Sequence, residues 1–211
     1  MDSLLKVGGL ALTVMLLSGG YQCLKQHGTV SASVSHAPLE AARHGNGSEH
    51  FSPAENLEQL EISELTSAAQ RARATKRPLD IAIYAFTHRA LAALLAREAE
   101  QGTDIRIYRD GEQYEQEERN AARFRDRSTT AMFRGQRNIH VRVKAASRGD
   151  LMHLKVWSDG QVLREGSANW SPSALKRQDN NVRFSHDVAE ARAFEADFEA
   201  MWVRPSNRIL Q

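Results

Sequence analysis

Cysteine is almost absent from this chain of 211 residues, since Cys23 is its only one. That excludes an internal disulfide framework and any zinc or iron–sulfur site built from several cysteines. Long apolar runs are also lacking, because the stretch at residues 7–17 falls short of the roughly 20 residues that span a bilayer. Hydrophobic residues make up 41% and charged residues 26%, so neither wholesale disorder nor a multi-span membrane protein is expected.

The first fifty residues are laid out as a leader followed by a linker. The apolar stretch follows Lys6 and precedes small residues, which is typical of a secretory signal peptide or, if it is not cleaved, of a membrane anchor. Residues 25–50 are rich in serine, histidine, alanine and glycine without apolar periodicity. We therefore predict a signal peptide or N-terminal membrane anchor over residues 1–24 and a flexible linker over 25–50. The protein is expected to be periplasmic, secreted or anchored to the membrane.

From residue 51 onward the sequence alternates between strand and helix patterns. Residues 79–86 (LDIAIYAF) have little polar interruption, as in a strand buried on both faces, and Ser52-Pro53 fits an N-cap followed by a first-turn proline. Further strands are expected at 104–110, 139–145, 152–158, 161–166 and 181–185, and helices from about 57, at 89–101, 111–127 and 188–202. This order predicts, over residues 51–211, an α/β/α sandwich with a mixed, largely parallel β-sheet.

Residues 152–169 (MHLKVWSDGQVLREGSAN) combine residue types that suit phosphate chemistry. On a strand, side chains at i and i+2 point to the same side, so His153 and Lys155 would project together. Gly160 allows a reversal, and the returning strand ends at a hydroxyl and an amide, those of Ser167 and Asn169. Lysine can match the charge on phosphate oxygens, serine and asparagine can donate hydrogen bonds, and histidine can attack or carry a proton.

This stretch resembles the signature of the phospholipase D superfamily, H-x-K-x4-D-x6-G-S-x-N. The matching residues are His153, Lys155, Asp159, Gly166, Ser167 and Asn169. The resemblance extends over about residues 51–204 and is greatest to the single-motif branch, which includes bacterial nonspecific endonucleases and the mitochondrial member of the superfamily. It implies a phospholipase D/nuclease-like fold and metal-independent hydrolysis of phosphodiesters through a phosphohistidine. It also implies a homodimer in which the two copies of His153 meet, and it implies no cofactor. The resemblance makes five residues candidates for catalysis: His153, Lys155, Asn169, Ser167 and Asp159.

Two positions depart from the signature. Only three residues separate Lys155 from Asp159, one fewer than in the family pattern. Asp159 could still support the site if a bulge restored its position, or it could be a turn aspartate before the tight hairpin at Gly160. Many relatives carry a glutamate where this chain has Asn180. If a carboxylate must orient the histidine, Asp179 is the candidate, although its position also suits a surface loop.

Charge is unevenly distributed behind a net charge of +2. Residues 49–118 carry 14 acidic and 8 basic side chains, whereas residues 119–148 carry nine basic side chains against Asp126 alone. The nine predicted nucleic-acid contacts are Arg119, Arg123, Arg125, Arg127, Arg134, Arg137, Arg142, Lys144 and Arg148. Such an arginine-rich segment suits a polyanionic backbone, although it could also be a solvated face. Aromatic residues within it are sparse (Phe124 and Phe133), so base stacking is not expected and cleavage should be largely independent of sequence.

Three functions remain open at this point. A nonspecific nuclease acting on DNA or RNA is favoured by the basic segment. A lipid phosphodiesterase acting on a phospholipid such as cardiolipin is favoured by the leader, although no long apolar loop flanks the motif. A catalytically silent nucleic-acid-binding component is suggested by the short Lys155–Asp159 spacing. No compact metal-ligand cluster is apparent, and linker or surface roles are expected for the other histidines: His27, His36, His44, His50, His88, His140 and His186.

Overall fold

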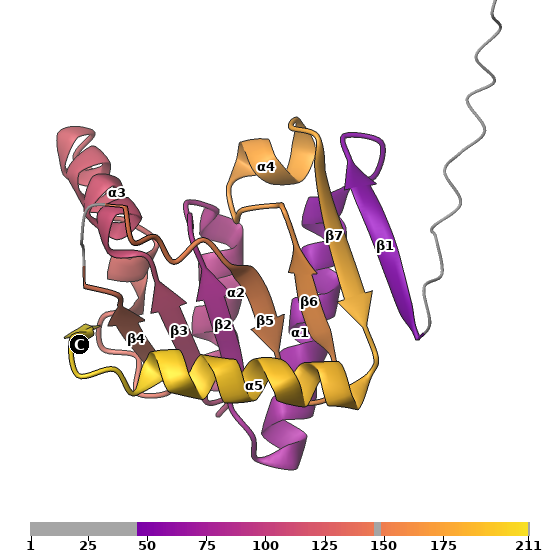
Figure 1. Cartoon of the computed structure of the whole chain (residues 1–211). Coiled ribbons are helices and arrows are strands. Elements are labelled where there is room, and N and C mark those ends of the chain that lie inside the picture. Colours follow the sequence, from indigo (N-terminus) through magenta and orange to yellow (C-terminus); the bar gives the residue numbers. More distant parts are fainter. Residues whose placement is uncertain (1–45, 146–148, 211) are drawn as a thin grey trace, which may run out of the picture. The chain divides into compact units, whose positions relative to one another are not determined.

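The computed structural model describes residues 46–145 and 149–210 (Figure 1). The predicted leader over residues 1–24, most of the predicted linker and Arg148 lie outside the described residues. No helix within the two described ranges combines the length and apolarity that crossing a bilayer requires.

Eight strands form one mixed sheet in the order β1-β7-β6-β5-β2-β3-β4-β8. The strands are β1 (Gly47–Ser52), β2 (Leu79–Ile83), β3 (Ile105–Arg109), β4 (Ile139–Val143), β5 (Lys155–Ser158), β6 (Leu163–Gly166), β7 (Asn180–Ser185) and β8 (Arg208–Leu210). The mixed sheet is confirmed, but the expectation that it is largely parallel was wrong. Only β2–β3 and β3–β4 pair in parallel, and the other five pairings are antiparallel. Parallel pairing needs a long crossover, whereas β5 and β6 are joined by a short hairpin.

Helices cover both faces of the sheet, as the sandwich prediction requires (Figure 1). They are α1 (Leu57–Thr75), α2 (Arg89–Glu100), α3 (Gly111–Arg123), the short 3-10 helix η1 (Thr130–Phe133), α4 (Pro172–Lys176) and α5 (Val188–Trp202). Because strand side chains alternate between faces, Ile81 packs in the large core with α1 and α2, whereas Ala82 packs with Phe198 and Trp202 of α5. Both faces of β2 are therefore buried, one against α1 and α2 and the other against α5.

The start of the domain differs from the sequence expectation. Residues 47–50, assigned to the linker, belong to β1, which pairs with β7 along its length. Ser52 ends this strand and its hydroxyl donates to the carbonyl of Gln178, so it is not the N-cap of α1. That cap is Asn56, whose side chain accepts from the Gln59 amide. The strand carries few apolar residues, and its placement depends on backbone pairing that hydrophobic periodicity does not report.

Strand direction places the two halves of the motif at one edge of the sheet. Lys155, the first residue of β5, pairs with Ile83 at the carboxyl end of β2. Gly166, the last residue of β6, pairs with Val182 near the start of β7. The carboxyl ends of β2, β3 and β6 therefore meet the amino ends of β5 and β7 along this edge, and α3 begins there directly after β3 (Figure 1).

Candidate active site

His153 and Lys155 form a close pair at this edge. The Lys155 Nζ lies 3.1 Å from the His153 Nδ1 and donates to the His153 carbonyl at 2.7 Å. Lys155 is buried, with 5% of its surface exposed, while the His153 ring is exposed. The expectation that the two side chains project together is confirmed, and their contact leaves the His153 Nε2 as the nitrogen available to a substrate.

Tyr84, which the sequence reasoning missed, packs against both members of the pair. Its ring centroid lies 4.5 Å from that of His153, and the Lys155 Nζ lies 5.0 Å from the same ring. The Tyr84 amide donates to the carbonyl of Leu154, between the two motif residues, at 2.9 Å. A ring in this place restricts the imidazole and attracts the lysine cation. The sequence signal that could have identified Tyr84 is a polar aromatic residue directly after a fully buried strand.

Asn169 reaches the same part of the edge through the residue after Tyr84. The Ala85 amide donates to Asn169 Oδ1 at 3.3 Å. No residue in the described ranges accepts from Asn169 Nδ2, so these N–H groups can donate to a ligand. Residues 84–85 thus connect the His153–Lys155 pair to the Asn169 amide, although the two halves of the motif are separated along the chain by a hairpin.

Ser167 makes its contacts on the β7 side of the loop. Its hydroxyl donates to Asn180 Oδ1 and accepts from the Asn181 amide, both at 3.0 Å. Asp179 is exposed and lines a cavity of about 260 Å³ with Ser167 and Asn180. These bonds join the loop to β7 and do not reach Lys155. Neither Ser167 nor Asp179 has a contact with His153 in the described residues.

Gly166 allows this loop to lie against β7. Its φ is 147°, and a Cβ at this position would lie 2.3 Å from the Asn181 carbonyl oxygen. A side chain therefore cannot fit without moving the backbone that carries Ser167 and Asn169.

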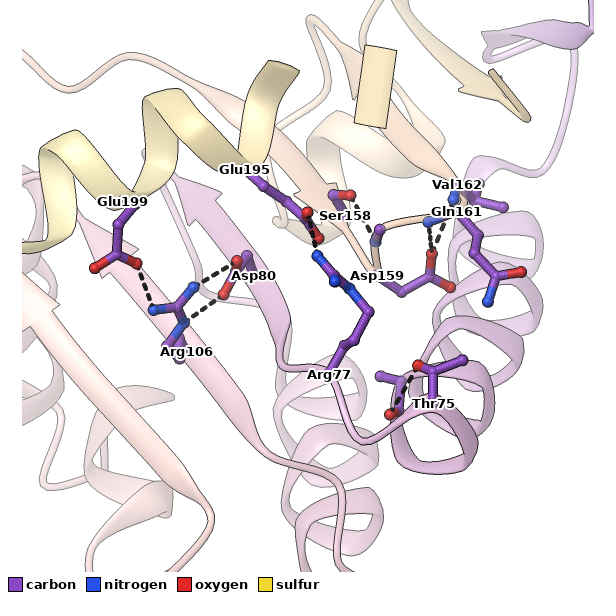
Figure 2. A network of polar contacts seen from close by, with 12 residues as sticks. Thr75, Arg77, Asp80, Arg106, Ser158, Asp159, Gln161, Val162, Glu195 and Glu199 are labelled. Atoms are coloured by element: carbon purple, nitrogen blue, oxygen red, sulfur yellow. Dashed lines mark hydrogen bonds and ion pairs between the residues drawn. The ribbon is translucent and has the colours of Figure 1, made fainter. Parts of the chain in front are cut away.

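Asp159 lies at the opposite end of β5, and the structure does not bring it together with the other candidates. Its carboxylate accepts from the amides of Gln161 and Val162 (Figure 2). It also accepts from the Arg71 guanidinium at 2.6 Å. Asp159 is fully buried there. These contacts are those of a turn aspartate that closes the β5–β6 hairpin, which agrees with the second of the two interpretations of its sequence position. The catalytic placement of Asp159 was wrong, because the strand separates it from His153.

A buried ion pair in the core positions the backbone of both halves of the motif. Arg164 on β6 and Glu61 on α1 are both fully buried and lie 2.9 Å apart. Arg164 also donates to the carbonyls of Lys155 at 2.5 Å and Ala168 at 3.1 Å. The second carboxylate oxygen of Glu61 accepts from the Trp157 indole at 2.8 Å. One guanidinium therefore sets the positions of the strand that carries Lys155 and the loop that carries Asn169.

The electrostatic surroundings tune the pair. Burial and the neighbouring Arg164 charge lower the pKa of Lys155 to about 8. Burial and the Lys155 charge lower the pKa of His153 below 6.5, while the Asp110 carboxylate acts in the opposite direction. Asp110 is buried at the start of α3, where it caps the helix through the Gln113 amide and accepts from the Met152 amide at 2.9 Å. At neutral pH these shifts favour a neutral imidazole beside a charged lysine.

Three of the other histidines lie beside carboxylates. The pairs are His50–Glu55, His88–Glu58 and His140–Asp104. The surface role expected for His88 was wrong, because it is buried and its Nδ1 caps α2 by accepting from the Leu91 amide. Within residues 46–145 and 149–210, no group of three or more histidine, cysteine, aspartate or glutamate side chains is arranged to hold a metal ion.

The residues of this site lie within a match to a protein family. The model described as cardiolipin synthase, PLD-like domain, matches residues 68–202, which include His153, Lys155 and Asn169. The chain belongs to the phospholipase D superfamily. The match covers one phospholipase D-like domain.

Solved structures of superfamily members share the fold. NucT from Helicobacter pylori matches with a TM-score of 0.58 and 23% identity, over 76% of this chain and 96% of that chain. The phospholipase D family member Nuc from Salmonella typhimurium matches with a TM-score of 0.57 and 21% identity, over 78% and 97%. The mitochondrial cardiolipin hydrolase of Chlamydomonas reinhardtii is 25% identical over 126 residues, 60% of this chain. The chain spans 52% of the length of that relative.

The basic residues of this phospholipase D-like domain are divided among several elements. Arg119, Arg123, Arg125 and Arg127 are exposed on the second half of α3 and the following loop. Arg142 instead packs on the Trp202 ring at 4.5 Å and donates to the Trp202 carbonyl. Three further residues of the nine predicted contacts are described. Arg134 and Arg137 line a cavity of about 550 Å³ beside β4, and Lys144 is half-buried. Four of the eight described residues of the predicted set thus lie on α3 and the loop that follows it.

Proposed function

We propose that this phospholipase D-like phosphodiesterase is a metal-independent, nonspecific nuclease that hydrolyses the phosphodiester bonds of DNA or RNA. The observation that carries the proposal is the 3.1 Å contact between His153 and a lysine that is buried yet charged at neutral pH. Such a pair offers a nucleophilic nitrogen and a fixed cation to one phosphate group. We also propose that residues 1–24 export the protein or anchor it to a membrane.

In the proposed mechanism the neutral His153 ring carries its proton on Nδ1, so that Nε2 has the lone pair that attacks phosphorus, and the Lys155 Nζ donates to the His153 carbonyl and to the phosphate instead of to Nδ1. A P–N bond forms, the P–O bond to the leaving group breaks, and a second histidine donates a proton to the departing oxygen. That second histidine then takes a proton from water, whose oxygen attacks phosphorus, breaks the P–N bond and regenerates His153. Lys155 and the Nδ2 of Asn169 balance the charge on the non-bridging oxygens through both steps.

The second histidine is proposed to be His153 of another copy of the chain. Each chain contains one motif, so a two-fold axis through the edge that carries His153 would supply the missing group by symmetry. The exposed side chains of Leu151 (44%) and Leu154 (40%) beside His153 provide apolar surface for such a contact.

Subunit mixing tests the dimer. When wild-type protein is denatured and refolded with an excess of His153→Ala protein, hybrids should form whose shared site has only one of the two histidines. Activity per wild-type chain should then fall toward zero as the excess grows. Size-exclusion chromatography with light scattering should give twice the chain mass. Activity that stays proportional to the wild-type chains would contradict a shared site.

The exposed arginines of α3 favour nucleic acid over phospholipid as the substrate. Two exposed guanidinium groups on α3 and two in the loop that follows it suit repeated phosphate contacts along a strand. Phospholipid hydrolysis is the second candidate, because Leu151 and Leu154 could instead contact a bilayer beside the catalytic histidine. The two candidates therefore make opposite predictions about which substrate is turned over.

One assay decides between them. The full chain is incubated in EDTA with plasmid DNA, single-stranded DNA, RNA and cardiolipin vesicles, beside His153→Ala and the control His140→Ala. His140 is an exposed histidine paired with Asp104, so its removal should have no effect. Nucleic-acid cleavage that His153→Ala abolishes supports the nuclease. Turnover of lipid alone supports the second candidate, and nucleic-acid binding without cleavage of any substrate overturns both.

A further inference from the structure

Phe124 is an apolar side chain that the core does not use. It follows the last residue of α3 and is 74% exposed, the highest value among the large apolar side chains in the described ranges. The next residue, Arg125, has a φ of 53°, a left-handed conformation that turns the chain immediately after the ring. A phenyl ring held out into solvent at the end of a helix has no evident role in the stability of the fold.

Arginines flank this ring in the chain. The Arg123 guanidinium lies 5.7 Å from the Phe124 centroid, and Arg119, Arg125 and Arg127 are exposed on the same segment. Asp126 is the one acidic residue of this segment, and its carboxylate lies 3.2 Å from Arg89, which draws a further cation to the site. An exposed aromatic ring among arginines is the arrangement with which proteins hold a single strand, since the cations contact phosphates and the ring stacks on a base.

A small cavity lies beside the ring. It has a volume of about 200 Å³, and its lining includes Phe124, Phe86, Ala121, Asn120, Thr87 and Thr129. Its surface is mainly apolar, and its polar lining includes Arg89, Arg127 and the carboxylates of Asp126 and Glu117, which pair with Arg89 and Arg109. Such a lining suits a flat, partly polar ring better than it suits a phosphate.

The cavity adjoins the catalytic residues through the loop after β2. The Ala85 amide holds Asn169, and the next two residues, Phe86 and Thr87, line the cavity. The Thr87 amide also donates to the carbonyl of Trp170, the neighbour of Asn169, at 2.8 Å. The outer Cα atoms of three successive residues such as 85–87 lie at most about 7 Å apart. A nucleic-acid strand with a phosphate at Asn169 can therefore reach the cavity.

We propose that the cavity beside Phe124 is a subsite for an unstacked nucleobase, which makes single-stranded nucleic acid the preferred substrate. The inference rests on the proposed nuclease function and specifies its substrate. A duplex keeps its base faces stacked and cannot present one to Phe124, whereas a single strand can. This proposal differs from the sequence-based expectation that no base stacks on the protein. That expectation rested on the small number of aromatic residues, which does not report how exposed a single phenylalanine is.

The test measures binding without cleavage, in the full chain carrying His153→Ala. Its probes are a thymidine 12-mer, an abasic 12-mer with the same phosphates, a 12-base-pair duplex and cardiolipin vesicles. The thymidine strand should bind about 5- to 150-fold more tightly than the abasic strand. Adding Phe124→Ala should remove this difference and leave affinity for the abasic strand unchanged. Phe124→Trp should retain the difference, and binding of the thymidine strand should quench the fluorescence of the introduced indole.

Val203→Ala is the matched control, because Val203 is also apolar and 58% exposed but lies at the end of α5. It should leave all affinities unchanged. Equal loss of affinity for both strands in Phe124→Ala, or no loss for either, would overturn the subsite. Loss of vesicle binding instead would assign the cavity to lipid. Failure of every nucleic acid to bind would overturn the nuclease itself, whereas a nuclease indifferent to Phe124 refutes the subsite alone.

Discussion

Replacement of Glu61 by glutamine should lower the free energy of unfolding by about 3–5 kcal/mol, because it leaves the guanidinium of Arg164 charged and unpaired in the core. Both side chains are fully buried, and Glu61 satisfies Arg164 and the Trp157 indole with its two oxygens. Glutamine can accept from one of these donors, but its amide N–H groups then face the other. Urea unfolding of the full chain at equilibrium measures the change through the transition midpoint.

Glu165→Gln provides the control for the Glu61 prediction. Glu165 also pairs with an arginine, Arg183, but on the surface, where its side chain is 44% exposed. Its replacement should change the unfolding free energy by less than about 1 kcal/mol. If the two variants were equally stable, the buried pair would contribute nothing beyond an exposed one. A double replacement, Glu61→Leu with Arg164→Met, should recover only part of the stability and none of the activity, since the Trp157 indole and the Lys155 and Ala168 carbonyls would lose their partners.

Local sequence was sufficient for the parts of the site that lie on one hairpin. The i and i+2 rule placed His153 beside Lys155, and the position of Gly160 placed the reversal that returns the chain toward Asn169. Strand and helix patterns also predicted the layered α/β architecture, because buried strands and amphipathic helices report their surroundings through composition alone. Each of these features depends on interactions between residues that are close in the sequence.

Features that depend on strand order were not predictable in this way. Tyr84 meets His153 because β2 and β5 are neighbours in the sheet, although 69 positions separate the two residues. Glu61 and Arg164 meet because α1 lies under β6. Strand β8 and the antiparallel majority of the sheet escaped prediction for the same reason. Hydrophobic periodicity identifies a buried face but not the element that covers it.

The site that results places opposing demands on its two titrating groups. In the proposed mechanism His153 must be neutral to attack phosphorus, whereas Lys155 must be charged to hold the phosphate. The 3.1 Å contact links these requirements, because the lysine charge stabilises the neutral imidazole. The low pKa of Lys155 is the cost of burying an ammonium group next to Arg164. Between the two pKa values the attacking His153 is neutral and Lys155 is charged, and the second histidine must hold its proton there, which the negative phosphate bound beside it would favour.

The pH dependence of kcat/KM should therefore be bell-shaped, with limbs that belong to these residues. Activity should rise with pH through a pKa below 6.5 as His153 loses its proton, and it should fall through a pKa of about 8 as Lys155 loses its charge. Each limb should approach a tenfold change per pH unit away from the optimum. Initial rates with a short single-stranded oligonucleotide at substrate concentrations below KM measure this profile in the free enzyme.

Lys155→Arg identifies the alkaline limb. A guanidinium stays charged throughout this range, so the fall near pH 8 should disappear even if the maximal rate decreases through altered geometry. The acid limb should remain, since the variant keeps a positive charge beside His153. Lys176→Arg, at an exposed lysine paired with Glu58, should leave both limbs in place. An alkaline limb that persists in Lys155→Arg would belong to another group, and protonation of the leaving oxygen by the second histidine would then be the step that sets it.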